Sequence, residues 1–207
     1  MIAIVDYGMG NLGSIPEHAS HRIGAEAVVT SDPAALADAE RLILPGVGSF
    51  DRAVENLERL GLIEALHDLV LRRGRLVLGI CLGMQLLGRG SEEGSRPGLG
   101  WLAADTDRFR FEGEHARLKV PHMGWNTLVP CRRSALLADL GPGPRFYFVH
   151  SYHVRCDSEE DVLATAVYGF PFHAAVGRDN ILGTQFHPEK SHRFGMRVLK
   201  NFVEMPP

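Results

Sequence analysis

Cysteine is scarce in this chain, and its few occurrences follow no known framework. The 207 residues include Cys81, Cys131 and Cys156, which are widely spaced and form no C-x-x-C pair. Three cysteines cannot all pair with one another, and a zinc site made of cysteines needs closely paired ligands. We therefore expect neither a disulfide framework nor a cysteine zinc site. Cys131 and Cys156 are interpreted as small apolar or half-exposed side chains.

Long apolar runs and a large excess of one charge are also missing. No apolar run approaches the roughly 18 residues that cross a bilayer. The segment Met1–Asp6 lacks the charged region and cleavage site of a signal peptide. The formal net charge is -3, from 22 basic and 25 acidic residues. This charge excludes a strongly basic nucleic-acid-binding surface as the main functional feature. We expect a cytoplasmic protein that binds neither membranes nor nucleic acids.

The composition that is present is that of an ordinary globular protein. With 45% hydrophobic and 23% charged residues, the chain can build one sizeable core, so a single domain over residues 1–207 is expected. Ser14–Glu17 predicts the start of a helix, and a helical period predicts another over Asp51–Arg73 with Gly61 as a possible break. Short β-branched runs predict strands at Ile2–Asp6, Ala27–Thr30, Arg41–Leu44 and Leu76–Ile80.

Apolar strands that are separated by helices predict a parallel sheet covered on both faces. The second half instead predicts strands with few helices between them, and a closing helix from about Arg193 to Phe202 with Phe194, Val198 and Phe202 on one face. The fold class is therefore α/β, with an antiparallel addition in the C-terminal half. Strands are expected at Phe109–Phe111, Thr127–Val129, Phe146–Val154 and Val162–Tyr168, and a hairpin pairs Ala174–Val176 with Ile181–Phe186 through the four-residue turn Gly177–Asn180.

Cys81 lies in a pattern typical of a nucleophile elbow. The run Leu78-Gly79-Ile80-Cys81-Leu82-Gly83 follows a predicted strand and opens a helical segment. A nucleophile there occupies a tight turn with a strained backbone, and flanking glycines let neighbouring backbone pass close by. A helix N-terminus beside the sulfur favours the thiolate form of a cysteine. A buried cysteine at a strand end is the plainer alternative.

A second strand ends in the glycine-rich loop Leu44–Gly48. Two glycines allow the loop to turn peptide N–H groups towards a neighbouring site, and a tetrahedral intermediate needs two such donors around its oxyanion. We predict the Leu82 N–H as one donor and a peptide near Val47, between Gly46 and Gly48, as the other. Taken alone, such a loop is usually only a turn.

His187 and Glu189 supply candidate proton-transfer groups near the C-terminus. An imidazole carries protons near neutral pH, and a carboxylate two residues on in an extended stretch could orient its other ring nitrogen. A His-x-Glu after a strand is also common as a surface pair. With ten histidines in the chain, spacing does not single out His187 as the base for Cys81.

Together, Gly79–Gln85 and Gln185–Glu189 resemble the motifs of the triad-type (class I) glutamine amidotransferases. The resemblance implies a Cys81–His187–Glu189 triad on their doubly wound, flavodoxin-like fold, with no metal and no cofactor. Further stretches resemble the glutaminase subunits of imidazole glycerol phosphate synthases, the most specific of them being Pro121-His122-Met123-Gly124-Trp125-Asn126. The others are Asp6–Leu12, Leu44–Gly48, Ser91–Gly94 and Tyr147–Tyr152.

This narrower resemblance implies both a reaction and a partner. The chain would hydrolyse glutamine and pass ammonia to a cyclase subunit with a (β/α)8 barrel, in a heterodimer that serves histidine biosynthesis. The glutamine would be held by Gln85, Glu93, Ser151 and Tyr152, and the partner-facing positions would be Asn11, Trp125, Tyr147 and Lys190. The alternatives are a glutaminase that serves another synthase, such as the one for pyridoxal phosphate, a catalytically silent scaffold that binds a partner, and a cysteine hydrolase of the same broad architecture.

Two positions depart from the family pattern. Gly88-Arg89-Gly90 stands where an apolar or aromatic residue is more usual, so the helix after the elbow is expected to end early. His153 occupies a place often taken by an aromatic residue. Both departures bear on the glutamine contacts and neither on the proposed triad.

Overall fold

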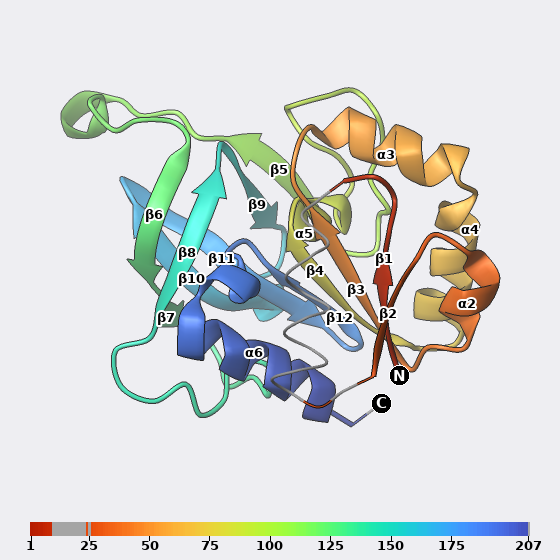
Figure 1. Cartoon of the computed structure of the whole chain (residues 1–207). Helices are drawn as coiled ribbons and strands as arrows, with labels where there is room; N and C mark the ends of the chain where they lie inside the picture. The colour runs from red at the N-terminus through yellow and green to blue at the C-terminus, as the bar shows by residue number, and fades with distance from the viewer. Residues whose placement is uncertain (10–23, 25, 207) are drawn as a thin grey trace.

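The predicted strands of the first half lie side by side in a parallel sheet (Figure 1). The computed structural model describes residues 1–9, 24 and 26–206, so Asn11 and the expected helix start at Ser14–Glu17 lie outside the described residues. The parallel strands follow the order β2 (Ala27–Thr30), β1 (Ile2–Val5), β3 (Arg41–Gly46), β4 (Leu76–Cys81) and β12 (Ile181–Thr184). The expected parallel sheet is therefore confirmed.

Antiparallel strands extend this sheet, as the sequence predicted for the second half. β12 pairs with β11 (Phe170–Arg178), then β10 (Val162–Tyr168) and β7 (Val129–Pro130) follow. β9 (Tyr152–Cys156) pairs with β11 and with β5 (Ala104–Arg108). A separate antiparallel pair, β6 (His122–Thr127) and β8 (Arg145–His150), stands beside the main sheet in Figure 1.

Alternate residues of the parallel strands feed two different apolar cores. On β1, for example, Ala3 and Val5 belong to one core, whereas Ile2 and Ile4 belong to the other. The first core is covered by α2 (Pro33–Ala37), α3 (Phe50–Arg59), α4 (Leu62–His67) and α5 (Leu82–Leu86), and the second by α6 (His192–Glu204). Because successive side chains of a strand point to opposite faces, strands buried on both faces must be apolar throughout, as these are.

The helix predicted over Asp51–Arg73 is present but divided. Gly61 separates α3 from α4, and the π-helical turn η2 (Asp68–Arg72) completes the segment. The closing helix is also confirmed, with Val198 and Phe202 fully buried. α2 was not predicted, because it has only five residues. The sequence does contain a signal for the start of α2, because Asp32 is an N-cap residue and is followed by proline. The Asp32 side chain accepts a hydrogen bond from the Ala34 N–H.

Several predicted strand boundaries of the second half are wrong. Phe109–Phe111 is not a strand: the β5–β9 ladder stops at Arg108, opposite Tyr152. Phe146–Val154 is divided at Ser151, because β8 and β9 pair with strands of different sheets.

The other two errors concern a gap and a turn. Thr127–Val129 spans the gap between β6 and β7, which also belong to different sheets. The hairpin turn has two residues, Asp179 and Asn180, because Gly177 and Arg178 continue the ladder. Alternating apolar residues located these strands, but they carry no information on the strand partners that set the ends.

The start of α5 lies in very close contact with the end of β3. A Cβ atom on Gly83 would lie 1.7 Å from the Leu44 carbonyl oxygen, and one on Gly79 would lie 2.6 Å from the Gly83 oxygen. Only glycine allows backbone to approach backbone this closely. The expectation that the glycines flanking Cys81 admit neighbouring backbone is therefore confirmed, and these contacts fix where β4 turns into α5.

Among the described residues, no helix combines the length and the apolar character that a membrane span requires.

Gly83→Ala should lower the free energy of unfolding by about 3 kcal/mol, because the new Cβ meets backbone that cannot rotate away. In an unconstrained helix the same change is stabilising, so destabilisation is diagnostic of the contact. Urea unfolding measures it. Gly90→Ala is a matched control, since its nearest atom is 3.9 Å away, and should change stability by less than about 0.5 kcal/mol. Equal effects of the two substitutions would contradict the account.

Candidate active site

Cys81 is held in a strained conformation at the junction of β4 and α5. Its φ of 54° and ψ of -107° are outside the regions that a residue with a side chain normally adopts. The elbow predicted from the sequence therefore has the expected strand, sharp turn and helix. The helix has only five residues, so its dipole is short and the immediate hydrogen-bond partners of the sulfur matter more.

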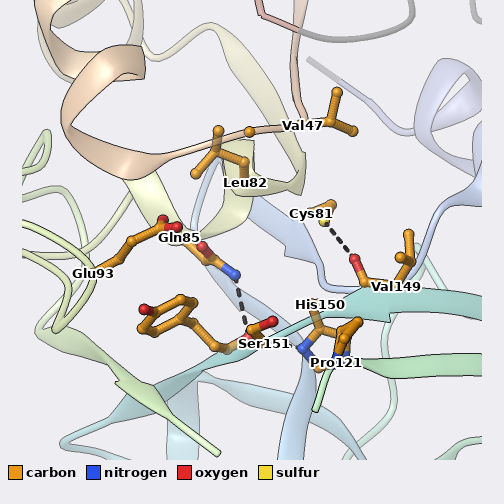
Figure 2. Close-up of a pocket in the computed structure, with 11 residues that line it drawn as sticks. Val47, Cys81, Leu82, Gln85, Glu93, Pro121, Val149, His150 and Ser151 are labelled. Atoms are coloured by element: carbon orange, nitrogen blue, oxygen red, sulfur yellow. Dashed lines mark hydrogen bonds between the residues drawn. The ribbon is translucent and has the colours of Figure 1, made fainter.

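One cavity of about 290 Å³ gathers most of the residues predicted for the site. Figure 2 shows Val47 and Leu82 on one side of it and Gln85 and Glu93 further along its wall. The Cys81 sulfur reaches the same cavity and lies 3.9 Å from the Val149 carbonyl oxygen. The lining residues are Val47, Gly48, Cys81, Leu82, Gln85, Glu93, Pro121, Val149, His150, Ser151 and Tyr152. Sequence reasoning had missed Pro121, Val149 and His150.

His187 and Glu189 form a buried pair near Cys81. The His187 Nδ1 atom lies 2.7 Å from Glu189 Oε1, and the two side chains are 2% and 5% exposed. The stretch is a 3-10 turn (Pro188–Lys190), not the extended segment expected, yet the carboxylate still reaches the ring. The His187 N–H donates to the Tyr147 carbonyl at 2.9 Å, and the Ser191 hydroxyl donates to the His187 carbonyl at 2.6 Å.

The charges around His187 favour its protonated form. Burial alone lowers the pKa of His187, but hydrogen bonding and charge from Cys81 and Glu189 outweigh it and raise the pKa to about 9. Glu189 is bound to Nδ1, so the buried Nε2 is the ring nitrogen through which Cys81 acts on His187, and it is the nitrogen available to a reacting group.

The predicted oxyanion loop follows β3 and runs beside the elbow. Gly46 pairs with Cys81 in the β3–β4 register, and Gly48 has a φ of 115°. Val47 is 39% exposed at the cavity. The loop is anchored by Tyr7, whose fully buried hydroxyl donates to the Pro45 carbonyl at 2.5 Å. Burial raises the pKa of Tyr7, so the phenol keeps the proton that it donates.

Glu93 is attached to the start of α3, which directly follows that loop. Its Oε2 accepts the Phe50 N–H at 2.9 Å. In return, the Asp51 carboxylate accepts the Ser95 and Arg96 N–H groups, each 3.0 Å from Oδ1. These hydrogen bonds lower the pKa of Asp51, and the bond from the Arg96 backbone N–H contributes most. The segment that carries Glu93 and the loop that carries Val47 are therefore tied to the same turn of helix.

Gln85 and Tyr152 are connected to a buried histidine pair that the sequence did not predict. Gln85 Nε2 donates to the Tyr152 carbonyl at 3.2 Å, and His150 Nδ1 lies 2.7 Å from the same oxygen. His150 Nε2 lies 3.0 Å from His122 Nδ1. Burial lowers the pKa of His122 to about 4 and that of His150 to about 3. The sequence signal for His150 was its alternation with Phe146 and Phe148, which share the buried face of β8.

Three of the positions predicted to face a partner lie together on another surface. Trp125 and Tyr147 are paired across β6 and β8, with ring centroids 5.9 Å apart. Lys190 Nζ lies 6.0 Å from the centre of the Tyr147 ring. Trp125 is 39% exposed and stacks on His192 with centroids 5.1 Å apart. Asn11 lies outside the described residues.

The structure shows what surrounds Gly88–Gly90 and His153, the two departures from the family pattern. α5 ends at Leu86, as expected from Gly88–Gly90, and Arg89 forms ion pairs with Asp105 and Asp157. His153 is buried against Phe109, with ring centroids 4.7 Å apart.

The two other cysteines differ from each other. Cys131 is exposed, whereas Cys156 is buried and burial raises its pKa to about 12.

Acid should destabilise the fold through His122 and His150. Their folded pKa values, about 4 and about 3, lie below the ordinary value of 6.5, so only the unfolded chain takes up these protons as the pH falls below 6.5. The free energy of unfolding should fall by about 2 kcal/mol per histidine between pH 7 and pH 5. His187 acts oppositely: its stabilisation is complete below 6.5 and is lost as the pH rises through about 9.

Urea unfolding at pH 7 and pH 5 tests this dependence. His122→Asn keeps an N–H donor for His150 but removes one titrating group, so it should reduce the difference by about 2 kcal/mol. His115→Gln alters a histidine whose side chain is 44% exposed and should leave the difference unchanged. A wild-type chain that is equally stable at both pH values would contradict the prediction.

Comparison with known proteins identifies the family to which the chain is related. The family model described as glutamine amidotransferase class-I matches residues 3–205. Imidazole glycerol phosphate synthase subunit HisH 2 of Methanococcus maripaludis is 48% identical over 204 residues, which cover 99% of each chain. The protein of the same name from Pseudomonas aeruginosa is 47% identical over 205 residues, covering 99% of this chain and 100% of the relative.

Solved structures agree on the fold. A crystal structure of a glutamine amidotransferase superposes with a TM-score of 0.73 at 22% identity, and covers 99% of this chain and 98% of that one. A structure of PurLQS from Thermotoga maritima gives a TM-score of 0.67 at 18% identity, with coverage of 98% and 96%. At these identities the likeness concerns the fold, and it confirms the fold class predicted from the sequence.

Proposed function

We propose a mechanism on the premise that the chain belongs to the class I glutamine amidotransferases and, within them, to the HisH subunits of imidazole glycerol phosphate synthase. The chain is accordingly a glutaminase subunit: it hydrolyses glutamine to glutamate and ammonia for histidine biosynthesis. The observation that carries the mechanism is the position of Cys81, a strained residue at the wall of a cavity with the His187–Glu189 pair beside it. No second function is favoured by any feature of the described residues.

Cys81 is the nucleophile of this mechanism. Its thiolate attacks the side-chain carbonyl carbon of glutamine and forms a C–S bond, so that the carbonyl oxygen becomes an oxyanion. When the tetrahedral intermediate collapses, the C–N bond breaks and His187 gives its proton to the leaving nitrogen. Ammonia departs and a glutamyl thioester remains. Water then attacks the thioester, His187 takes up the water proton, and glutamate leaves as the thiolate is restored.

His187 is suited to the first proton transfer. With a pKa of about 9, the ring is protonated at neutral pH and can donate to the departing amine. Glu189 holds Nδ1 at 2.7 Å, so the proton that moves is the one on Nε2. The carboxylate also stabilises the imidazolium that stands beside the thiolate, which is the role of the third member of a triad.

The oxyanion rests on backbone N–H groups near Leu82 and Val47. Leu82 is the first residue of α5, where N–H groups have no partner within the helix. The Val47 peptide lies between Gly46 and Gly48, and this pair of glycines allows the peptide to turn. Two donors held in place before the reaction stabilise charge that develops only in the transition state.

The cavity suits one small amino acid. At about 290 Å³ it is at the lower end of ligand pockets. Glu93 supplies a carboxylate for the α-ammonium of glutamine, and the Ser151 and Tyr152 region supplies donors for the α-carboxylate. Gln85 uses its side-chain nitrogen on protein oxygens, so its oxygen is the atom presented to the substrate.

The ammonia passes to a cyclase subunit that forms imidazole glycerol phosphate and an aminoimidazole carboxamide ribotide. We propose a heterodimer with a (β/α)8 barrel, which contacts the surface of Trp125, Tyr147 and Lys190 and also Asn11. Trp125 and Tyr147 are of the residue types that are enriched in binding hot spots. The reaction takes place in the cytoplasm, and residues 1–207 act as a single domain.

Cys81→Ala should abolish glutamate formation from glutamine in the presence of the cyclase, because it removes the only thiol among the described residues that line the cavity. Ammonia and glutamate release are measured by a coupled assay. Cys131→Ala removes an exposed cysteine away from the cavity and should keep the wild-type rate. Glutaminase activity in the Cys81→Ala variant would contradict the mechanism.

Activity should also depend on the partner. The Val47 peptide can rest with its N–H turned away from the site, so we expect little glutamine hydrolysis by the chain alone and a rise of at least about tenfold with the cyclase and its ligand. Steady-state rates with and without the cyclase measure the difference. Equal rates in the two conditions would refute a partner-controlled oxyanion site.

A further inference from the structure

Gln185 lies beside the nucleophile, although the mechanism above gives it no role. β12 ends at Thr184, which pairs with Ile80 in parallel register, so the next residue stands next to Cys81. The Gln185 side chain is completely buried, and its Nε2 atom lies 3.6 Å from the Cys81 sulfur. We propose that Gln185 is a further catalytic residue, which donates an N–H to the sulfur and stabilises the thiolate. The proposal rests on the role of Cys81 given above.

The surrounding bonds determine which end of the Gln185 amide faces the sulfur. A backbone carbonyl only accepts hydrogen bonds, so the Tyr152 carbonyl requires the nitrogen of Gln85 to point towards it (Figure 2). The second N–H of Gln85 then reaches Gln185 Oε1 at 3.2 Å. With its oxygen engaged in this way, Gln185 must present its nitrogen to the sulfur.

The same carbonyl fixes the histidines behind it. His150 must carry a proton on Nδ1 to donate to Tyr152, so its Nε2 accepts from His122 Nδ1. Both rings are then neutral, in agreement with their lowered pKa values. A flipped Gln185 amide would place its nitrogen against the nitrogen of Gln85, so that two buried donors would face each other without an acceptor.

A donor at this position has a definite electrostatic effect. The Val149 carbonyl, 3.9 Å from the sulfur, accepts a hydrogen bond from a thiol and repels a thiolate. The Gln185 N–H has the opposite preference, because a hydrogen bond to the charged form stabilises that form. Together with the His187 imidazolium, Gln185 offsets both the carbonyl and the burial of the sulfur.

Gln185→Met removes the donor and keeps the length of the side chain. Alkylation of Cys81 by iodoacetamide, followed from pH 5 to 10, reports the thiolate and needs neither glutamine nor cyclase. We expect the midpoint of the alkylation profile to move up by about one pH unit, and the rate at pH 7 to fall roughly threefold to tenfold. Peptide mass mapping assigns the label to Cys81, so failure of the glutaminase mechanism would not affect this measurement.

Thr184→Val is the matched control. Its hydroxyl donates to the Phe186 carbonyl at 3.2 Å and is equally buried one residue earlier, at the end of β12, but it does not contact the sulfur. The Thr184→Val variant should have a lower melting temperature, like Gln185→Met. Its alkylation profile should be the same as that of the wild type. Gln185→Asn, which keeps an amide but shortens it by one methylene, serves if the Met variant does not fold, and should move the midpoint in the same direction.

An alkylation profile that is unchanged in folded Gln185→Met or Gln185→Asn would overturn the proposal. So would an equal shift in Thr184→Val, because the effect would then follow the loss of a buried polar group and not the loss of a donor to sulfur.

Discussion

The contact between Gly83 and the Leu44 carbonyl is the constraint on which the site depends. It brings the start of α5 against the end of β3 so closely that no side chain fits between them. β4 must therefore turn within one residue, and Cys81 takes the strained, positive-φ conformation that this turn requires. The cost of that conformation is of order 1–3 kcal/mol, and it is met by the two apolar cores that hold the sheet and its helices together.

The parallel register then assembles the chemistry around the sulfur. Gly46 at the end of β3 is level with Cys81, and Gln185 follows the end of β12 on its other side. His187 comes two residues later and is held by Glu189. Residues from three distant parts of the sequence thus meet at the carboxyl edge of adjacent strands, which is where sites form in sheets of this kind.

Local chemistry made the elbow, the parallel strands and the break at Gly61 predictable from the sequence. The pairing of Cys81 with His187 was available only through the resemblance to a family, because ten histidines compete and nothing local marks one of them. Strand ends such as Arg108 and the division at Ser151 depend on partners that a single strand does not reveal. The polar network from His122 to Gln185 also escaped prediction, since its members are joined by buried contacts between four separate parts of the sequence.

The central claim is that backbone geometry, and not exposure, selects the reactive cysteine. Cys131 is exposed, whereas Cys81 is 6% exposed and lies at the wall of a cavity. The most direct test is peptide mass mapping of the chain bound to its cyclase, after treatment with a chloroketone analogue of glutamine. The account predicts one covalent adduct on Cys81, prevented by excess glutamine. Labelling that falls first on Cys131, or that glutamine does not slow, would contradict it.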